Sequence, residues 1–293
     1  MIDNTNERIA LKVSWNTVLI NVMLSVIKLA AGIFGKSSAM LSDAVHTLSD
    51  VLSTFIVMIG VKVSAKKADS KHPYGHERFE CVAALILSVM LLATGLGIGY
   101  GGIRSVLAGK SEVLPVPGLL ALVAAVVSIA VKEAMYWYTR AAAKKIDSGA
   151  LMADAWHHRS DALSSVGSFV GILGARVGYP VMDAAASLVI CLFILKASVD
   201  IFMDSINKMT DSACDEKVTQ EITALVLAQD KVLGVDLLRT RLFGNRMYVD
   251  IEIRVNGKLL ISEGHDVAQA VHDAIEGGFE KVKHCMVHVN PQL

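Results

Sequence analysis

Asp43-Ala-Val-His46-Thr-Leu-Ser49-Asp50-Val-Leu52-Ser53 and Asp154-Ala-Trp-His157-His-Arg-Ser160-Asp161-Ala-Leu163-Ser164 are two copies of one pattern, and seven of their eleven positions match in register. In each copy the first Asp, the His and the second Asp fall at i, i+3 and i+7, which places all three on one face of an α-helix. Two such faces can converge on one divalent ion. The four side chains expected to bind it, as N and O ligands of a zinc-like site, are His46, Asp50, His157 and Asp161.

The rest of the sequence predicts that these motifs lie in a membrane. The chain is 53% hydrophobic, and its apolar residues are concentrated before residue 208. A helix needs about 20 residues to cross a bilayer core, and ionisable groups within such helices usually mark an ion path. We predict a bundle of six transmembrane helices in a domain of residues 1–207, with spans near 11–34, 39–63, 79–107, 115–139, 150–177 and 180–206.

Basic residues in the short connections predict the orientation. Lys66, Lys67, Lys71, Arg78, Arg140, Lys144 and Lys145 fall on one side, against Lys36, Arg104, Lys110 and Arg176 on the other. The richer side is expected to face the cytoplasm, with both termini. We therefore expect a multi-pass integral protein of a bacterial inner (cell) membrane. The formal net charge is zero, which gives no indication of a nucleic-acid partner.

Residues 208–293 have the pattern of a small α+β domain. Helices are expected at 215–228 and 262–277, and strands at 235–243, 247–255 and 282–289, which gives the order αββαβ. Two helices on one face of a three-stranded sheet leave its other face or an edge to be covered, and about 80 residues make a small core. We expect this domain to form a homodimer.

Segments along most of the chain resemble the cation diffusion facilitator family of metal transporters. Besides the two His-x-x-x-Asp motifs, they are His72-Pro-Tyr-Gly75-His76-Glu-Arg78-Phe-Glu80, Leu238-Arg239-Thr240-Arg241 and Val287-His288-Val-Asn290-Pro291. The resemblance implies six transmembrane helices followed by a cytoplasmic ferredoxin-like domain that dimerises. It also implies that the domain senses metal.

By the same resemblance, His46, Asp50, His157 and Asp161 form a transport site in the middle of the membrane, reached alternately from each side. Two neutral imidazoles and two carboxylates carry a formal charge of −2, which either a divalent cation or protons can neutralise. Competition between metal and proton predicts efflux by metal/proton antiport. Zn²⁺ fits the mixed N and O ligands best, and cobalt, cadmium, iron and manganese remain alternatives.

Other polar residues have two interpretations. Asp43 and Asp154 each lie one turn before a His of the motif. As functional residues they would hydrogen-bond the imidazole ring or line a polar path. As structural residues they would only begin a polar helix face. The resemblance implies a second metal site at Asp69, His72 and His76, whereas the alternative is that these histidines cap the third span. It also implies that Arg78 and Asp211 form a charge pair between the two domains.

The tail departs from the family pattern. His265 and His288 match histidine ligands, but Asp236 and Glu252 stand where the family often has His, and Asn290 replaces an acidic residue. Asn is a poor ligand for zinc. The pattern still permits a metal at Asp236, His265 and His288, with Glu252 as a further candidate ligand. His284 is an outside candidate, and His272 is expected on the surface.

Two other functions are considered. An intramembrane metalloenzyme could activate water at a His/Asp site, but no His-Glu-x-x-His motif occurs, since the segment that starts at His76-Glu77 ends in Glu80. We therefore expect no enzyme. A membrane sensor or scaffold could bind ions without moving them.

Overall fold

The computed structural model of the chain describes residues 2–34, 38–108, 119–176 and 181–292, and within these it leaves some side chains undescribed, including those of Asp43 and His46. It consists of two compact units, Met1–Ser205 and Ile206–Leu293. Each unit has its own hydrophobic core.

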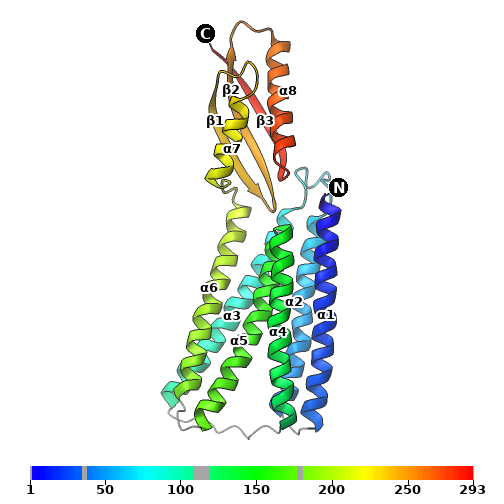
Figure 1. Cartoon of the computed structure of the whole chain (residues 1–293), viewed down its shortest axis with the longest axis vertical. Coiled ribbons are helices and arrows are strands. Elements are labelled where there is room, and N and C mark those ends of the chain that lie inside the picture. Colours follow the sequence, from blue (N-terminus) through cyan, green and yellow to red (C-terminus); the bar gives the residue numbers. More distant parts are fainter. Residues whose placement is uncertain (1, 35–37, 109–118, 177–180, 293) are drawn as a thin grey trace. The chain divides into compact units, whose positions relative to one another are not determined.

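Long helices make up the first unit (Figure 1). In the described residues they are α1 (Ile2–Phe34), α2 (Ser38–Ser64), α3 (Arg78–Ala108), α4 (Leu119–Ile146), α5 (Gly149–Arg176) and α6 (Val181–Met209). They coincide with the predicted spans, except that α1 and α4 extend well beyond the apolar stretches. Within the described residues, segments of α1 (Thr5–Ala31) and α3 (Arg78–Gly101) are long and apolar enough to cross a membrane. Six spans therefore remain a prediction.

The junction between α4 and α5 explains why α4 ends later than the apolar stretch. Asp147 has a φ of 54°, a left-handed conformation that stops a helix. Ser148 follows, and its hydroxyl accepts a hydrogen bond from the backbone N–H of Leu151 at 3.2 Å, as an N-cap residue does. This tight turn places α4 beside α5, and the two helices pack along each other.

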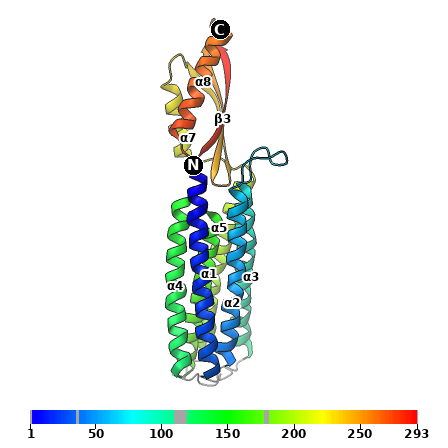
Figure 2. The same cartoon turned by 90° about the vertical axis from the view of Figure 1, so that its right-hand side faces the viewer.

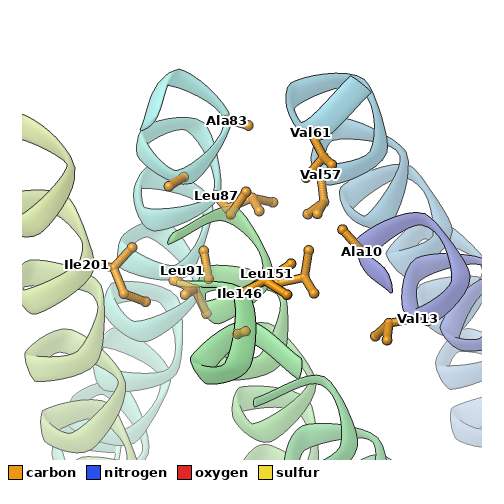
Figure 3. Packing of buried hydrophobic residues seen from close by; sticks show 14 of the residues in the cluster. Ala10, Val13, Val57, Val61, Ala83, Leu87, Leu91, Ile146, Leu151 and Ile201 are labelled. Atoms are coloured by element: carbon orange, nitrogen blue, oxygen red, sulfur yellow. The ribbon is translucent and has the colours of Figure 1, made fainter. Parts of the chain in front are cut away.

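The helices of the first unit pack through small and aliphatic side chains (Figure 3). A side chain on Gly60 of α2 would collide with the Cβ of Ala83 on α3. One on Gly99 of α3 would lie 2.6 Å from the Sγ of Cys191 on α6. Small residues let helices approach closely in this way. The buried core beside these contacts includes Val57, Val61, Leu87, Leu91, Ile146, Leu151 and Ile201.

The second unit has the predicted αββαβ order. Its elements are α7 (Glu216–Leu227), β1 (Gly234–Phe243), β2 (Arg246–Asn256), α8 (Ile261–Gly278) and β3 (Val282–Gln292). The sheet order is β1-β2-β3, with β1 antiparallel and β3 parallel to β2. The hairpin turns at Gly244, whose φ of 64° suits glycine.

Both helices of the second unit cover one face of the sheet (Figure 2). Strand β2 alternates there between buried and more exposed positions, with Val249, Ile251 and Ile253 buried. The helices contribute apolar residues at helical spacing to the same core. These are Ile222, Val226, Val267, Val271 and Ile275.

Replacement of Ile251 by Ala should destabilise the second unit by about 2–5 kcal/mol, because the 1% exposed side chain would leave a cavity in the core. Hydrogen–deuterium exchange of the β2 and β3 amides in the full chain would measure the loss. Ile261→Ala is the matched control, since Ile261 is 94% exposed and its truncation should leave exchange unchanged. Equal effects of the two variants would show that β2 does not form the core.

Candidate metal centre

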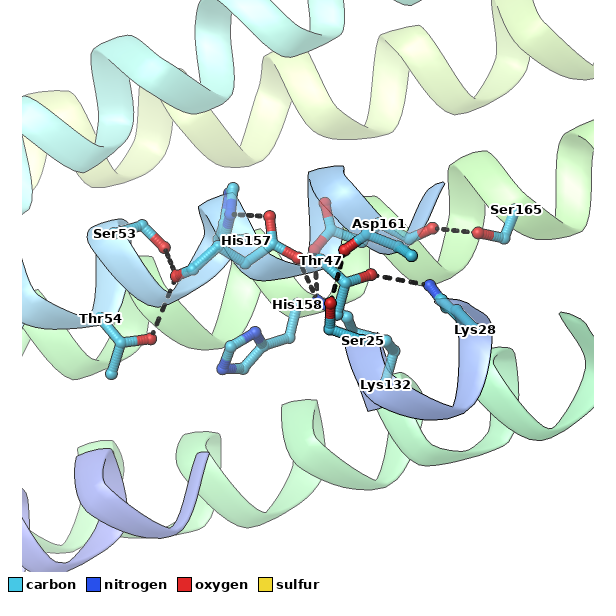
Figure 4. A network of polar contacts seen from close by, with 12 residues as sticks. Ser25, Lys28, Thr47, Ser53, Thr54, Lys132, His157, His158, Asp161 and Ser165 are labelled. Atoms are coloured by element: carbon cyan, nitrogen blue, oxygen red, sulfur yellow. Dashed lines mark hydrogen bonds and ion pairs between the residues drawn. The ribbon is translucent and has the colours of Figure 1, made fainter. Parts of the chain in front are cut away.

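A buried cluster of charged side chains joins α2, α4 and α5 (Figure 4). The ammonium of Lys132 on α4 donates to Oδ2 of Asp50 on α2 at 2.5 Å and to Oδ2 of Asp161 on α5 at 2.9 Å. Nε2 of His157, one turn before Asp161 on α5, lies 3.4 Å from Oδ1 of Asp50. The structure thus brings three of the four residues of the predicted transport site together around a cationic group.

The cluster is buried: at most 8% of the surface of each of its four side chains is exposed. Asp50, His157 and Asp161 each offer one ligand atom, and these atoms lie within 4.8 Å of one another. Two carboxylates and an imidazole at this spacing can bind a divalent cation. The structure therefore contains a candidate metal centre between α2 and α5.

Sequence reasoning missed Lys132. The sequence does contain an indication of its role, because this lysine lies within the predicted span 115–139. A charged side chain is costly to bury in a membrane span and usually pairs with another charged group. What the sequence does not show is that α4 packs along α5 and so brings this ammonium between carboxylates of two other helices. That contact depends on the tertiary structure alone.

Hydroxyl groups next to the carboxylates are satisfied within their own helices. Ser53 donates to the carbonyl oxygen of Asp50 at 2.7 Å, and Ser165 donates to the carbonyl oxygen of Asp161 at 2.9 Å. Such bonds to the preceding turn are common for Ser in helices. These two hydroxyl groups therefore bind the backbone of Asp50 and Asp161, whereas Lys132 binds the carboxylates.

The remaining motif residues have different positions. The side chains of His46 and Asp43 lie outside the described ones, so their predicted roles stay predictions, although His46 is one turn before Asp50 on α2. Asp154 is fully buried, and its carboxylate accepts a hydrogen bond from Thr54 at 3.3 Å and lies 3.5 Å from Nε2 of His158. Asp154 thus lies beside His158 and Thr54, and its predicted role at the ring of His157 or along a polar path stays a prediction.

A second buried lysine lies between α1 and α2. Lys28 is 2% exposed, and its ammonium donates to the hydroxyl of Thr47 at 2.8 Å. Thr47 belongs to the first copy of the repeated motif, so the polar face of α2 has a cationic neighbour on α1 as well as on α4. Buried cations of two different helices thus face α2, Lys28 from α1 and Lys132 from α4.

Models of known domain families match both units of the chain. The model of the cation efflux transmembrane domain matches residues 14–210. The model described as the cation efflux protein, cytoplasmic domain, matches residues 214–292.

The chain belongs to the cation efflux family. An uncharacterised transporter of Methanocaldococcus jannaschii is 37% identical over 270 residues, which cover 92% of this chain and 94% of that protein. The manganese efflux system protein MneP of Bacillus subtilis is 30% identical over 292 residues, with 97% of each covered. A solved cadmium form of the MamM CTD is 24% identical, with a TM-score of 0.26, over 27% of this chain and 96% of that one. This cation efflux protein is an integral membrane transporter of divalent metal cations, and not an enzyme.

The loop between α2 and α3 of this cation efflux protein gathers the predicted second set of ligands. Nδ1 of His72 lies 3.5 Å from Oδ1 of Asp69, and Nε2 of His76 lies 3.4 Å from Oδ2 of Asp69. Backbone N–H groups of His72 and Lys71 donate to Asp69 at 2.7 and 2.9 Å. These bonds, that of His72 first, and the nearby imidazoles lower the pKa of Asp69 below its usual value. The loop therefore holds an ionised carboxylate beside two imidazoles.

The tail residues predicted as ligands are not gathered into such a cluster in the described part of the chain. Asp236 accepts a hydrogen bond from Nε of Arg254 at 2.6 Å, and the amide of Asn290 donates to both Asp236 and Glu252 at 3.1 Å. A guanidinium and an amide thus occupy the carboxylates that sequence reasoning assigned to metal. His288 lies opposite Glu252 in the register of β3 and β2, and His265 lies on α8. Arg78 and Asp211 belong to different units, so their pairing stays a prediction.

Replacement of Lys132 by Met should destabilise the first unit by about 3–5 kcal/mol, because it leaves two buried carboxylates without their ammonium partner. Thermal melting of the full protein in detergent, without divalent metal, would show the loss. Lys144→Met on the same helix is the control, since Lys144 is exposed. Added Zn²⁺ should restore the melting temperature of Lys132→Met more than it raises that of the wild type. A variant as stable as the control would contradict the ion-pair assignment.

Proposed function

We propose that this cation efflux protein carries Zn²⁺ out of the cytoplasm in exchange for protons, with Asp50, His157, Asp161 and His46 as the transport site. The observation that supports the proposal is that two carboxylates from two helices bind one buried cation, the ammonium of Lys132, with the imidazole of His157 beside one of them. A site that already binds one positive group has the charge needed to bind a metal ion.

Metal binding at this site requires the ammonium to leave it. Lys132 contacts one oxygen of each carboxylate, and a metal ion that bridges Asp50 and Asp161 would compete for the same two oxygens. The lysine is flexible enough to move aside along its four-carbon stem. Lys132 is therefore a competitor for the transported cation, and it keeps the empty site from holding two unpaired buried charges.

Proton exchange follows from the charges of the empty site. Among the described side chains at the centre, the two carboxylates outnumber the single ammonium. The remaining negative charge is costly in a buried place unless a proton neutralises it. A proton gradient directed into the cell would thus favour protonation of the site and metal release on the outer side, and loss of the protons and metal binding on the cytoplasmic side.

Zinc is favoured over manganese by the ligand types. Imidazole nitrogen together with carboxylate oxygen suits Zn²⁺, whereas Mn²⁺ prefers oxygen ligands. Manganese is the second candidate because MneP, 30% identical to this chain, is named as a manganese efflux protein. Iron, cobalt and cadmium remain further alternatives of the same chemistry. The two histidines of the repeated motif are the residues on which this choice depends.

The proposal includes six transmembrane helices with both termini in the cytoplasm. The match of residues 214–292 to a cytoplasmic domain supports the location of the tail, and an even number of spans would return the N-terminus to the same side. The tail would form the homodimer. Asp69, His72 and His76 would bind a second ion in the loop, where their atoms lie within 4.8 Å of one another.

Transport by reconstituted protein separates the proposal from its alternative, a membrane sensor that binds metal without moving it. Purified protein in proteoliposomes, with an internal metal dye and an internal pH dye, should move Zn²⁺ and protons in opposite directions. Mn²⁺ in place of Zn²⁺ tests the second candidate. Metal binding with no flux of either ion would favour the sensor.

The variant Asp161→Asn should reduce Zn²⁺ flux roughly a hundredfold or more, because it removes a charged ligand that the site needs at every turnover. Its control is Asp200→Asn on α6, where the carboxylate is 69% exposed and pairs with Lys196 at 4.0 Å. The control should transport normally. Near-normal flux through Asp161→Asn would remove this residue from the transport site.

A further inference from the structure

Another set of metal-ligating side chains lies in the tail, apart from Asp236, Glu252, His265 and His288. His272 and Glu276 are one turn apart on α8, and His284 is on the adjacent strand β3. Nε2 of His272 lies 3.3 Å from Oε1 of Glu276, and Nδ1 of His284 lies 3.4 Å from the same oxygen. The three ligand atoms lie within 4.8 Å of one another.

Hydrogen bonds to the backbone of Cys285 fix the orientation of two of these side chains. Nδ1 of His272 lies 2.8 Å from the carbonyl oxygen of Cys285. A carbonyl oxygen can only accept, so Nδ1 holds the hydrogen and donates it. The backbone N–H of Cys285 donates to Oε1 of Glu276 at 3.0 Å. One residue of β3 thus holds both side chains of α8 in place.

This arrangement directs the lone pair of His272 at a carboxylate. With the hydrogen on Nδ1, the neutral ring has only a lone pair at Nε2, and it faces Oε1 of Glu276 at 3.3 Å. Two acceptors at that distance repel each other unless a cation or a proton lies between them. Histidines that bind metal commonly donate their other N–H to a backbone carbonyl, as His272 does.

The spacing of the ligand atoms fits a small tetrahedral site. Bonds of about 2.0–2.1 Å to a tetrahedral zinc ion place neighbouring ligand atoms about 3.3–3.4 Å apart. The two measured separations, 3.3 and 3.4 Å, agree with that value. Two imidazoles and one carboxylate are also a set that zinc binds, with water as the fourth ligand.

We infer that His272, Glu276 and His284 bind a divalent cation of the zinc class, which links α8 to β3. The side chains are 27%, 33% and 49% exposed, so the ion can exchange with the solvent. The site uses no residue of the transport site or of the loop. The sequence hypothesis of a metal at Asp236, His265 and His288 is separate from it, and His272 is a half-buried ligand instead of the expected surface residue.

Zinc binding by the full protein in detergent tests the inference. Equilibrium dialysis against Zn²⁺, followed by metal analysis, should give one ion fewer per chain for Glu276→Gln and for His284→Ala than for the wild type. Asp273→Asn is the matched control, because it removes an exposed carboxylate from the same helix and should bind as many ions as the wild type. Co²⁺ in place of Zn²⁺ should show a tetrahedral visible spectrum that decreases in the same two variants.

Glu276→Gln keeps the fold testable, because the amide oxygen of Gln can still accept the N–H of Cys285. Exchange of the α8 and β3 amides in metal-free protein should therefore equal that of the wild type, and Zn²⁺ should slow it in the wild type alone. If Glu276→Gln binds as much Zn²⁺ as the wild type, the cluster is an imidazolium–carboxylate pair and the inference is wrong. If Zn²⁺ slows exchange equally in both proteins, the ion lies elsewhere and the inference is also wrong.

Discussion

The organisation of the first unit depends on the cost of burying charge among apolar helices. Burying the carboxylates of Asp50 and Asp161 would cost a large free energy if nothing neutralised their charge. The ammonium of Lys132, from a third helix, neutralises it. The requirement links α2, α4 and α5 more specifically than apolar packing, which tolerates alternative contacts. The same two carboxylates can exchange the ammonium for another cation, because a cation of suitable size can bind the same oxygens.

Hydrophobic patterning predicted much of the fold. The helices of the first unit coincide with the apolar stretches, and the αββαβ order of the tail followed from alternation and helical spacing. The exceptions are informative. Helix α4 continues past its apolar stretch until Asp147 adopts a left-handed conformation, so the helix end is set by the backbone at this residue and not by the apolar pattern.

The candidate site was predictable only in part. Spacing along one helix placed His157 and Asp161 on one face, and repetition of the motif indicated that Asp50 would join them. The contacts of Lys132, of Asp154 with His158, and of Asp236 with Arg254 and Asn290 all cross between elements. Such contacts depend on which helices or strands become neighbours. In the tail, they give the carboxylates of Asp236 and Glu252 partners on neighbouring strands.

The backbone of Cys285 has a consequence for how sheets of this kind assemble. Strand β3 is at the edge of the sheet, and an edge strand with unused N–H and C=O groups can add a strand from another molecule. At Cys285 both groups are occupied by the side chains of Glu276 and His272. At this position helix α8 therefore leaves no backbone group for an added strand, which interrupts continuous extension of the sheet along β3.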